Sequence, residues 1–556
     1  MVAFKVFDIE AYNWNSVYAI GIYDGIKVNT EVHNPSQDRL ESNNSFIEWL
    51  LTNLNDGDIV YAHYGGRYDF LFIIDYVNTT KKARIVKFII INGSVAQMIV
   101  RFNDKSIMFR DSAHILPASL LRLTNDFNVE HKKLSMNYDI GVRDTNFIQY
   151  FNNDLMGLYE VLSKEEFLTD KLTLASNSMN SFIKDFYPNK MSINNIRIDN
   201  YFRESYYGGR TEVFRMKGEE LNYYDVNSLY PYVMREFKYP LPIANNYVYS
   251  TELDSISDGI YNCTITAPKI QIPVLPVRLD GKLIFPYGTW TGTYASPELR
   301  LAIELGYDVK INSGFSFIES DYIFKDYVDY WYKIKSTSSG SKKAVAKLML
   351  NSLYGKFGQQ RVKTEYKLVN GKNIPEFSVV IGGFAFNLTE RENKYSKFLH
   401  SEIASLITSY ARVHLYRLML RAGLDRIYYA DTDSIITDYT MDVSDKLGEV
   451  KNEGYIKEFI ALAPKLYAYI DSDGRSIVKS KGFNSSKLSF NMLKAALESK
   501  NYSHINTQKD GLTTFLRAVN KDSYTESYKL TRSFKTEYTK RIVNKDYTTE
   551  PLFLSG

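Results

Sequence analysis

The sequence predicts a chain of several domains in which strands and helices are mixed, an α/β and α+β multidomain architecture. Its 556 residues correspond to about three to five structural units, at roughly 100–200 residues for each unit. Apolar and alternating runs over 4–23 and 58–63 are typical of buried strands. Apolar residues recur at helical spacing over 147–168, 343–357 and 402–423. Strands and helices are therefore both expected.

The composition excludes one class of protein and limits the kinds of metal site that the chain could form. Cys263 is the one cysteine of the sequence, so a module stabilised by internal disulfides is excluded. One cysteine and 7 histidines also leave few ligands for zinc. Any bound metal is therefore expected to be held by carboxylates, which favour Mg²⁺ or Mn²⁺. No apolar run reaches the roughly 18 residues of a membrane span, so we expect an intracellular protein that stays out of membranes.

Positive charge is concentrated near the C-terminal end of the sequence. Residues 481–556 carry 13 Lys and Arg against 7 Asp and Glu, whereas the whole chain has a net charge of +4. A basic segment of this kind could follow a phosphate backbone. An ordinary solvated surface explains the same charges, and on this feature alone it is the favoured interpretation.

Four acidic residues of the N-terminal third form a first candidate site. Asp8 and Glu10 lie two apart on a predicted strand, so both side chains project from one face. Asp69 precedes an apolar run, and Tyr150 and Asp154 lie four apart on one face of a predicted helix. Four such carboxylates could hold two metal ions about 3.5–4 Å apart for phosphodiester hydrolysis. Taken singly, each acid is more often a surface or capping residue.

A second candidate site combines three acids from two distant segments. Asp225 ends an apolar strand that is followed by a turn into a helix. Asp431 and Asp433 fall at a tight turn between two apolar runs. A hairpin with acids at its tip, beside a strand that ends in another acid, can hold two Mg²⁺ ions against a triphosphate.

A predicted helix over 342–357 separates these two segments. It carries Lys343, Lys347, Asn351 and Tyr354 at positions i, i+4, i+8 and i+11, hence on one face. This face could offer ammonium groups to phosphates and an aromatic ring to a base. Without the acidic strings on either side, a helix with a solvated lysine edge would be the better interpretation.

The acidic series of the N-terminal third resembles the three exonuclease motifs of family B DNA polymerases, whose proofreading domain is RNase H-like. The resemblance implies that Tyr150 orients the attacking water, that Lys133 assists hydrolysis and that Ser112 contacts single-stranded DNA. Tyr64 and Ala113 depart from the family pattern, which has Asn and Leu there. These departures are therefore expected to change the binding of a frayed 3′ end more than the hydrolysis itself. The implied metal ligands are Asp8, Glu10, Asp69 and Asp154.

The strings around Asp225, along the predicted helix and around Asp433 resemble motifs A, B and C of the same family. This implies a right-hand polymerase with palm, fingers and thumb, in which Asp225 and Asp433 are the principal metal ligands and Asp431 is secondary. Tyr230 is implied as a steric gate against a 2′-hydroxyl, and Lys465 and Tyr467 match a K-x-Y motif that holds the primer terminus. The implied nucleotide-binding residues are Val226, Tyr230, Lys335, Lys343, Lys347, Asn351 and Tyr354, and Val226 is also included in the metal site.

Two further features resemble the protein-primed branch of the family. Tyr206, Gly208 and Gly209 match its Y-x-G-G segment, whose glycines would let the backbone approach the template strand closely. The intervals 266–325 and 358–398 match its two insertions. The resemblance implies that the first insertion contacts a terminal protein. It implies that the second supports processivity and strand displacement. Alternating residues in the second insertion predict a β-hairpin. Ordinary surface loops are the alternative.

The resemblance implies a DNA-directed DNA polymerase with a 3′→5′ proofreading exonuclease and two Mg²⁺ or Mn²⁺ ions in each active site. The implied partners are primer-template DNA, single-stranded 3′ ends, dNTPs and a terminal protein, for a monomer in the cytoplasm of a host cell. A nucleic-acid-primed polymerase, or a nuclease with a non-catalytic DNA-binding half, are the alternatives. The expected domains are an exonuclease (1–188), palm (189–265), first insertion (266–325), fingers (326–357), second insertion (358–398), palm (399–480) and thumb (481–556).

Overall fold

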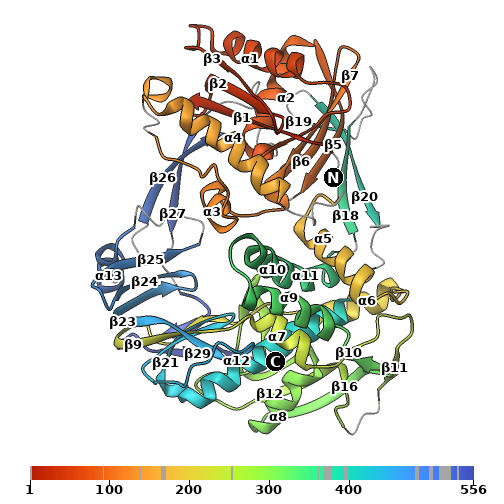
Figure 1. Ribbon diagram of the computed structural model, residues 1–556. Helices are drawn as coiled ribbons and strands as arrows, with labels where there is room; N and C mark the ends of the chain where they lie inside the picture. Colours follow the sequence, from red (N-terminus) through yellow and green to blue (C-terminus); the bar gives the residue numbers. More distant parts are fainter. Residues whose placement is uncertain are drawn as a thin grey trace.

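The computed structural model contains two large β-sheets, with helices on their faces and between them (Figure 1). Among the helices that it describes, none combines the length and the apolar character needed to span a membrane. The structure describes residues 3–91, 93–136, 140–164, 171–251, 255–360, 362–368, 378–381, 384–392, 398–481, 488–499, 505–512, 527–534 and 538–556.

The first sheet forms the N-terminal unit and has seven strands in the order β3-β2-β1-β4-β7-β6-β5. Its central strands β1, β4 and β7 are parallel, and the outer strands pair antiparallel. Helices α1 and α2 bury one face, and α3 and α4 pack on the other. The elements are β1 (Lys5–Tyr12), β2 (Ser16–Tyr23), β3 (Val28–Val32), α1 (Arg39–Asn53), β4 (Ile59–Ala62), α2 (Asp69–Thr80), β5 (Ala83–Ile91), β6 (Ser94–Phe102), β7 (Lys105–Asp111), α3 (Leu120–Asp126) and α4 (Phe147–Ser163). The strands expected over 4–23 and 58–63, and the helix from 147, are confirmed.

The second large sheet is antiparallel, with the order β25-β24-β23-β9-β22-β21-β8. Helices α7 and α12 bury one of its faces. Because β9 and β22 are neighbours, the end of one and the start of the other meet, although some 200 residues separate them in sequence. The elements are β8 (Thr211–Val213), β9 (Lys217–Val226), α7 (Leu229–Glu236), α12 (Ser401–Ala422), β21 (Ile427–Asp431), β22 (Ser434–Thr437), β23 (Val450–Ala463), β24 (Leu466–Asp471) and β25 (Ser476–Ser480).

A group of helices lies between the two sheets (Figure 1). Val345 and Met349 of α10 belong to the same apolar cluster as Phe147 and Phe151 of α4, so this group packs directly on the N-terminal unit. The helix expected over 343–357 is interrupted at Leu353, where α10 ends and α11 follows. The elements are α5 (Leu174–Ser181), α6 (Ile196–Glu204), α9 (Lys325–Thr337), α10 (Gly340–Ser352) and α11 (Tyr354–Phe357).

Two smaller sheets lie in the regions predicted as insertions. A five-stranded sheet has the order β11-β16-β12-β15-β30, and its first strand begins at residue 247, upstream of the predicted boundary at 266. A three-stranded sheet has the order β18-β20-β19, and β18 lies against β5 of the N-terminal unit. The hairpin turn expected around 369–373 lies outside the described residues. The elements are β11 (Tyr247–Ser250), β12 (Gly259–Ala267), β15 (Tyr287–Ala295), α8 (Ser296–Glu304), β16 (Asp308–Phe317), β18 (Val362–Leu368), β19 (Ser378–Ile381) and β20 (Phe384–Glu392).

The last part of the chain returns to the second large sheet. The predicted thumb region begins with α13 and the paired strands β26 and β27, but residues 538–556 pack against β8 and β15. Tyr538 accepts a hydrogen bond from the Val213 N–H at 3.0 Å. The remaining elements are β10 (Tyr239–Pro240), β13 (Val277–Leu279), β14 (Lys282–Ile284), β17 (Ser320–Asp321), α13 (Phe490–Glu498), β26 (Ile505–Leu512), β27 (Ser527–Phe534), β28 (Arg541–Val543), β29 (Thr549–Pro551) and β30 (Phe553–Ser555).

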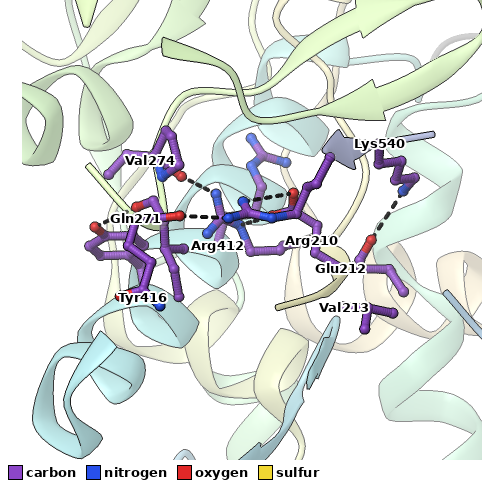
Figure 2. Close-up of polar contacts among 12 residues, drawn as sticks. Arg210, Glu212, Val213, Gln271, Val274, Arg412, Tyr416 and Lys540 are labelled. Atoms are coloured by element: carbon purple, nitrogen blue, oxygen red, sulfur yellow. Dashed lines mark hydrogen bonds and ion pairs between the residues drawn. The ribbon is translucent and has the colours of Figure 1, made fainter. Parts of the chain in front are cut away.

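A buried group of charges fastens this returning segment to β8. The Glu212 carboxylate lies 3.5 Å from Arg210 Nε and 3.5 Å from Arg541 Nη1, and all three side chains are buried. Arg541 Nη2 also donates to the Gln271 carbonyl at 2.7 Å. Figure 2 shows Arg210 between the segment of Gln271 and Glu212, with Lys540 beyond it. Removing the Glu212 carboxylate would leave the buried guanidinium groups of Arg210 and Arg541 without the ion-pair partner that they share.

We predict that Glu212→Ala lowers the free energy of unfolding by about 3–5 kcal/mol, the usual cost of breaking a buried ion pair from one side. The measurement is urea denaturation followed by circular dichroism. Glu304→Ala is the matched control, because Glu304 pairs with Arg417 at the surface, where both side chains are about half exposed. Similar midpoints for the two variants would contradict the stabilising role of Glu212.

Candidate active sites

The N-terminal acids meet on the α4 side of the first sheet. Asp8 and Glu10 project from β1 on the face opposite to Phe7 and Ile9, whose side chains pack with α1 and α2. One carboxylate oxygen from each of Asp8, Glu10 and Asp154 lies within 4.8 Å of the others. The structure therefore brings together acids from a strand and a helix that are separated by more than 140 residues.

Asp69 joins this group from the first turn of α2. It is buried, and its Oδ1 accepts a hydrogen bond from the Ile9 N–H at 3.1 Å. This bond fixes Asp69 beside the strand that carries Asp8 and Glu10. All four acids predicted as metal ligands are thus near one another.

Burial and mutual repulsion raise the pKa values of these acids. Burial raises the pKa of Glu10 to about 7, although the Lys133 ammonium opposes the shift. Burial, reinforced by neighbouring acids, raises the pKa of Asp69 to about 8, and burial followed by repulsion from Asp69 and Glu10 raises that of Asp8 well above its usual value. Carboxylates gathered in this way are electrostatically unfavourable unless a proton or a cation balances them.

The donor set of this site suits a hard divalent cation. The closely spaced ligand atoms of Asp8, Glu10 and Asp154 are all carboxylate oxygens, which Mg²⁺ prefers. The buried Oδ1 of Asp154 has no hydrogen-bond partner among the described residues. A cation bound by the three carboxylates would supply a partner for it.

Lys133 and Tyr150 complete the group. Lys133 Nζ donates to the Tyr150 hydroxyl at 2.9 Å and forms an ion pair with Asp154. The arrangement can neutralise part of the acidic charge and hold a phenolic hydroxyl beside it. Tyr150 and Asp154 come from α4, and Lys133 comes from the segment that precedes it. The roles predicted for Tyr150 and Lys133 stay predictions.

The residues predicted to grip a single strand differ in exposure. Ser112 is buried, and its Oγ donates to the Ala62 carbonyl at 3.2 Å and lies 3.0 Å from His63 Nδ1. Ala113 is also buried, whereas Tyr64 is 38% exposed and adopts a left-handed backbone conformation with φ of 60°. Of the two departures from the family pattern, Tyr64 is therefore the one that solvent can reach.

The second acidic set lies where β9 and β22 meet. Asp225 pairs with Ser434 across the two strands, and the Val226 N–H donates to the Asp433 carbonyl at 2.7 Å. Thr432 adopts a positive φ of 61° at the turn between Asp431 and Asp433. Backbone pairing, rather than side-chain contacts, thus sets Asp225 beside the turn.

The acids of this second set also repel one another. Burial, with additional repulsion from Asp225 and Asp431, raises the pKa of Asp433 to about 6. Burial raises the pKa of Asp225, against the effect of Lys451, whose Nζ lies 3.4 Å from its carboxylate. Asp225 and Asp433 therefore form a second carboxylate pair suited to divalent cations.

Asp431 has a different environment from the other two acids. Lys465 Nζ donates to both of its oxygens, at 2.7 and 2.9 Å, and the Thr211 hydroxyl donates at 3.3 Å. The Tyr467 ring packs against Tyr429, whose hydroxyl accepts from the Lys465 N–H at 2.9 Å. The K-x-Y segment thus lies against the acidic turn, and Lys465 already engages Asp431. The secondary role of Asp431 stays a prediction.

The predicted lysine-bearing face is divided between two helices, because Tyr354 lies on α11, after the interruption at Leu353. The other three predicted residues lie on α10. Lys343, Lys347 and Asn351 are exposed along it. Lys335 of α9 donates from Nζ to Ser228 Oγ at 2.6 Å, and its pKa is lowered by burial and by the nearby ammonium groups of Lys347, Lys451 and Lys343. Such a concentration of positive charge attracts anions such as phosphates.

An aromatic ring of α7 packs against one of α11. The Tyr230 and Tyr354 rings are stacked, with centroids 4.4 Å apart and planes at 14°. Burial raises the pKa of both hydroxyl groups, so both stay protonated at neutral pH. A stacked aromatic pair contributes about 0.5–1.5 kcal/mol beyond the area it buries, which favours this arrangement of the two rings.

The Y-x-G-G loop connects α6 to β8 and lies beside the acidic turn. A Cβ atom on Gly209 would come within 2.8 Å of Thr432 Cγ2, so glycine is needed for this close approach. Gly208 has open space around it, and the Tyr206 ring covers Gly358. The close approach seen at Gly209 is to the acidic turn; the approach of these glycines to template DNA stays a prediction.

Sequence reasoning missed the residues that hold this loop. Arg412 of α12 donates to the Tyr207 carbonyl at 2.6 Å and to the Gly208 carbonyl at 2.9 Å. Its guanidinium also forms two bonds with the Glu298 carboxylate, at 2.7 and 2.6 Å, and both side chains are buried. The available signal was a charged residue on the apolar face of the helix over 402–423.

Comparisons with known proteins place the chain in a family. Residues 52–154 and 142–412 match the family described as DNA polymerase type B, organellar and viral. The chain is 29% identical to a protein of Neurospora intermedia described as a probable DNA polymerase, over 86% of this chain and 58% of that protein. It is 28% identical to the DNA-directed DNA polymerase of Enterobacteria phage PRD1, over 79% of this chain and 78% of that protein.

The matched regions do not extend over the whole of the longer relatives. The chain spans 58%, 36% and 43% of the fungal relatives from Neurospora intermedia, Podospora anserina and Ascobolus immersus.

The fold is similar to that of solved polymerase structures. Phi29 DNA polymerase complexed with primer-template DNA superposes with a TM-score of 0.73 at 21% identity, covering 96% of this chain and 100% of that one. The same polymerase complexed with single-stranded DNA gives 0.72 at 20% identity over the same shares. This likeness confirms the predicted fold class, a multidomain α/β and α+β chain with the fold of a family B polymerase. Since the family model also matches more than half of its length, the chain belongs to the DNA polymerases type B, organellar and viral.

Proposed function

We propose that the chain is a DNA-directed DNA polymerase that also removes nucleotides from 3′ ends. The observation that carries the proposal is the presence of two separate carboxylate sets, one on each large sheet. The first lies beside Lys133 and Tyr150, and the second faces the lysine-bearing helix α10. Hydrolysis and nucleotidyl transfer each require such a set. The family membership supports the same activity.

In the proposed transfer, the primer 3′-hydroxyl oxygen attacks the α-phosphorus of a dNTP, a phosphodiester bond forms, and pyrophosphate leaves. Divalent ions, when bound, would lower the pKa of the attacking hydroxyl and neutralise charge on the leaving group. Asp225, Asp433 and the backbone at Val226 would hold them. Lys347, with Lys343 and Lys335, would bind the triphosphate, and Asn351 would line the same pocket.

The tyrosine pair and the K-x-Y segment would set the position of the substrates. Tyr230, held flat against Tyr354, would block the space that a ribose 2′-hydroxyl needs. Lys465 and Tyr467, beside the acidic turn, would hold the primer terminus. Contacts of this kind accelerate transfer by fixing the attacking oxygen in line with the leaving group.

In the proposed hydrolysis, a water oxygen attacks the terminal phosphodiester and the 3′-oxygen of the penultimate nucleotide leaves. Asp8, Glu10, Asp69 and Asp154 would hold Mg²⁺ or Mn²⁺, and the Tyr150 hydroxyl would orient the water. Lys133 would offset the negative charge that develops. The proposed partners are primer-template DNA, single-stranded 3′ ends and dNTPs, for a monomer that acts in the cytoplasm of a host cell.

The finer part of the proposal is initiation on a terminal protein, with strand displacement during elongation. It is supported by the Y-x-G-G loop, which Arg412 holds beside the acidic turn, and by the two small sheets in the regions of the implied insertions. The nucleophile at initiation would then be a hydroxyl group of that protein. There are two alternatives. The first is a polymerase that starts only from nucleic-acid primers, and the second is a nuclease with a non-catalytic second half.

We predict that the two activities separate by mutation. Asp433→Ala should lower primer extension about 1,000-fold or more, since metal-ion stabilisation of the transition state is worth several kcal/mol, and it should leave shortening intact. Asp8→Ala should do the reverse. The assay uses a 5′-labelled primer on a circular single-stranded template with Mg²⁺, with and without dNTPs.

Asp473→Ala is the control for these variants, because Asp473 is an exposed acid at the turn between β24 and β25. Both activities should survive in it. Extension beyond one circle by the unmodified protein would demonstrate strand displacement. Shortening without any extension would instead favour the nuclease with a non-catalytic second half.

We predict that the metal-free protein loses stability as the pH rises from about 5 to 8.5. The folded chain binds protons more tightly than the unfolded chain at Glu10 and Asp69, so the stabilisation is complete near pH 4 and is lost as the pH passes about 7 and about 8. Mg²⁺ should therefore raise the melting temperature more at pH 8.5 than at pH 6, measured by differential scanning calorimetry. An Asp8→Asn/Glu10→Gln protein should lose most of this difference. An equal effect of Mg²⁺ at both pH values would contradict the proposed metal site.

We predict that initiation transfers a nucleotide to protein. The chain would be incubated with Mg²⁺, a labelled dNTP, and the product of a neighbouring gene as candidate terminal protein. Label that migrates with that product in a denaturing gel, and that requires Asp433, would support protein priming. Extension of annealed primers without any labelled protein would favour nucleic-acid priming.

A further inference from the structure

The segment that carries Lys133 is clamped onto helix α4. Glu160 Oε2 accepts the backbone N–H groups of Glu130 at 2.9 Å and His131 at 3.2 Å. Its other oxygen, Oε1, pairs with His131 Nδ1. Two turns toward the start of the helix, Asn153 Nδ2 donates to the Lys132 carbonyl at 2.8 Å. Two side chains of α4 thus hold three consecutive residues just before Lys133.

A glycine lies between these two side chains on α4. A Cβ atom on Gly157 would come within 2.3 Å of the His131 carbonyl oxygen, a backbone atom that cannot swing aside as a side chain would. Glycine weakens the interior of a helix relative to alanine. The close approach of residues 130–133 gives a physical reason for a glycine in the middle of α4.

The clamp shares a helix face with two groups of the acidic site. Asn153, Gly157 and Glu160 follow Tyr150 at intervals of three and four residues, which line up along one side of a helix. Lys133 then reaches Tyr150 and Asp154 with its ammonium group, while its own N–H donates to Thr124 Oγ1 at 3.2 Å. The backbone of Lys133 is therefore fixed relative to the same helix that carries the groups it contacts.

We propose that Gly157, Glu160 and Asn153 are positioning residues of the exonuclease, which fix Lys133 against Tyr150 and Asp154. This rests on the proposed exonuclease function. The carboxylate of Glu160 is used by two backbone N–H groups and by His131, so its role is to hold the segment. The clamp fixes the backbone that leads into Lys133, so its side chain starts from one position relative to Tyr150 and Asp154.

The first test is Gly157→Ala. The added methyl group should push residues 130–133 off the helix, shift Lys133 by about 1 Å, and lower the exonuclease kcat about 10- to 100-fold with little change in KM. Primer extension should stay at the unmodified level, because its acids lie on the other sheet. Alanine strengthens a helix relative to glycine, so a weakened α4 would not explain the loss. Asn152→Ala, a half-buried neighbour on α4, is the control and should leave both activities intact.

A double-mutant cycle separates positioning from a general loss of structure. If Gly157 acts through Lys133, adding Gly157→Ala to Lys133→Ala should lower kcat no further than Lys133→Ala alone. An additive loss would overturn the proposal. Full exonuclease activity in Gly157→Ala would also overturn it.

Two milder variants keep the test independent of how well Gly157→Ala folds. Glu160→Gln keeps one oxygen that can accept both backbone N–H groups but loses the oxygen that pairs with His131, whereas Glu160→Ala loses all three contacts. Exonuclease kcat should therefore fall further in Glu160→Ala than in Glu160→Gln, while extension persists. Equal and unimpaired exonuclease activity in both would overturn the inference alone. An unmodified protein that extends primers but never shortens them would overturn the exonuclease and this inference together, which distinguishes the two failures.

Discussion

Repulsion among buried carboxylates is the constraint on which both active sites depend. Asp8, Glu10 and Asp154 bring their oxygens within 4.8 Å of one another, and burial holds their pKa values above the usual range. Asp225 and Asp433 repeat the same situation at the second sheet. Folding therefore brings negative charges together at two places, and the repulsion is relieved when the carboxylates bind protons or cations. Such clusters are costly to bury unless their charge is balanced.

The framework around the acids is built to withstand this repulsion. The turn between Asp431 and Asp433 is held by backbone pairing with β8 and β9 and by Lys465. At β8, Glu212 forms buried ion pairs with Arg210 and Arg541, which hold the C-terminal segment against the sheet. Ligand groups fixed from several directions keep their geometry when a cation or substrate binds.

The fold also holds the positively charged groups of both sites in fixed positions. Lys133 reaches the first acidic set from a segment that Glu160 holds on α4. On the second side, α10 turns its lysine face outward while Val345 and Met349 pack into the apolar cluster of the N-terminal unit. The helix that would bind a triphosphate is therefore anchored on the exonuclease-like unit.

Local sequence pattern determined the elements and the faces on which the candidate residues lie. A period of two put Asp8 and Glu10 on one face, and a helical period put Tyr150 and Asp154 together, because these patterns depend only on near neighbours. Tertiary structure alone decided the Arg412–Glu298 pair, the clamp of Glu160 and Gly157 on residues 130–133, and the return of residues 538–556 to β8. These contacts join residues far apart in the chain, and a periodic pattern shows that a face is buried without showing which distant segment covers it.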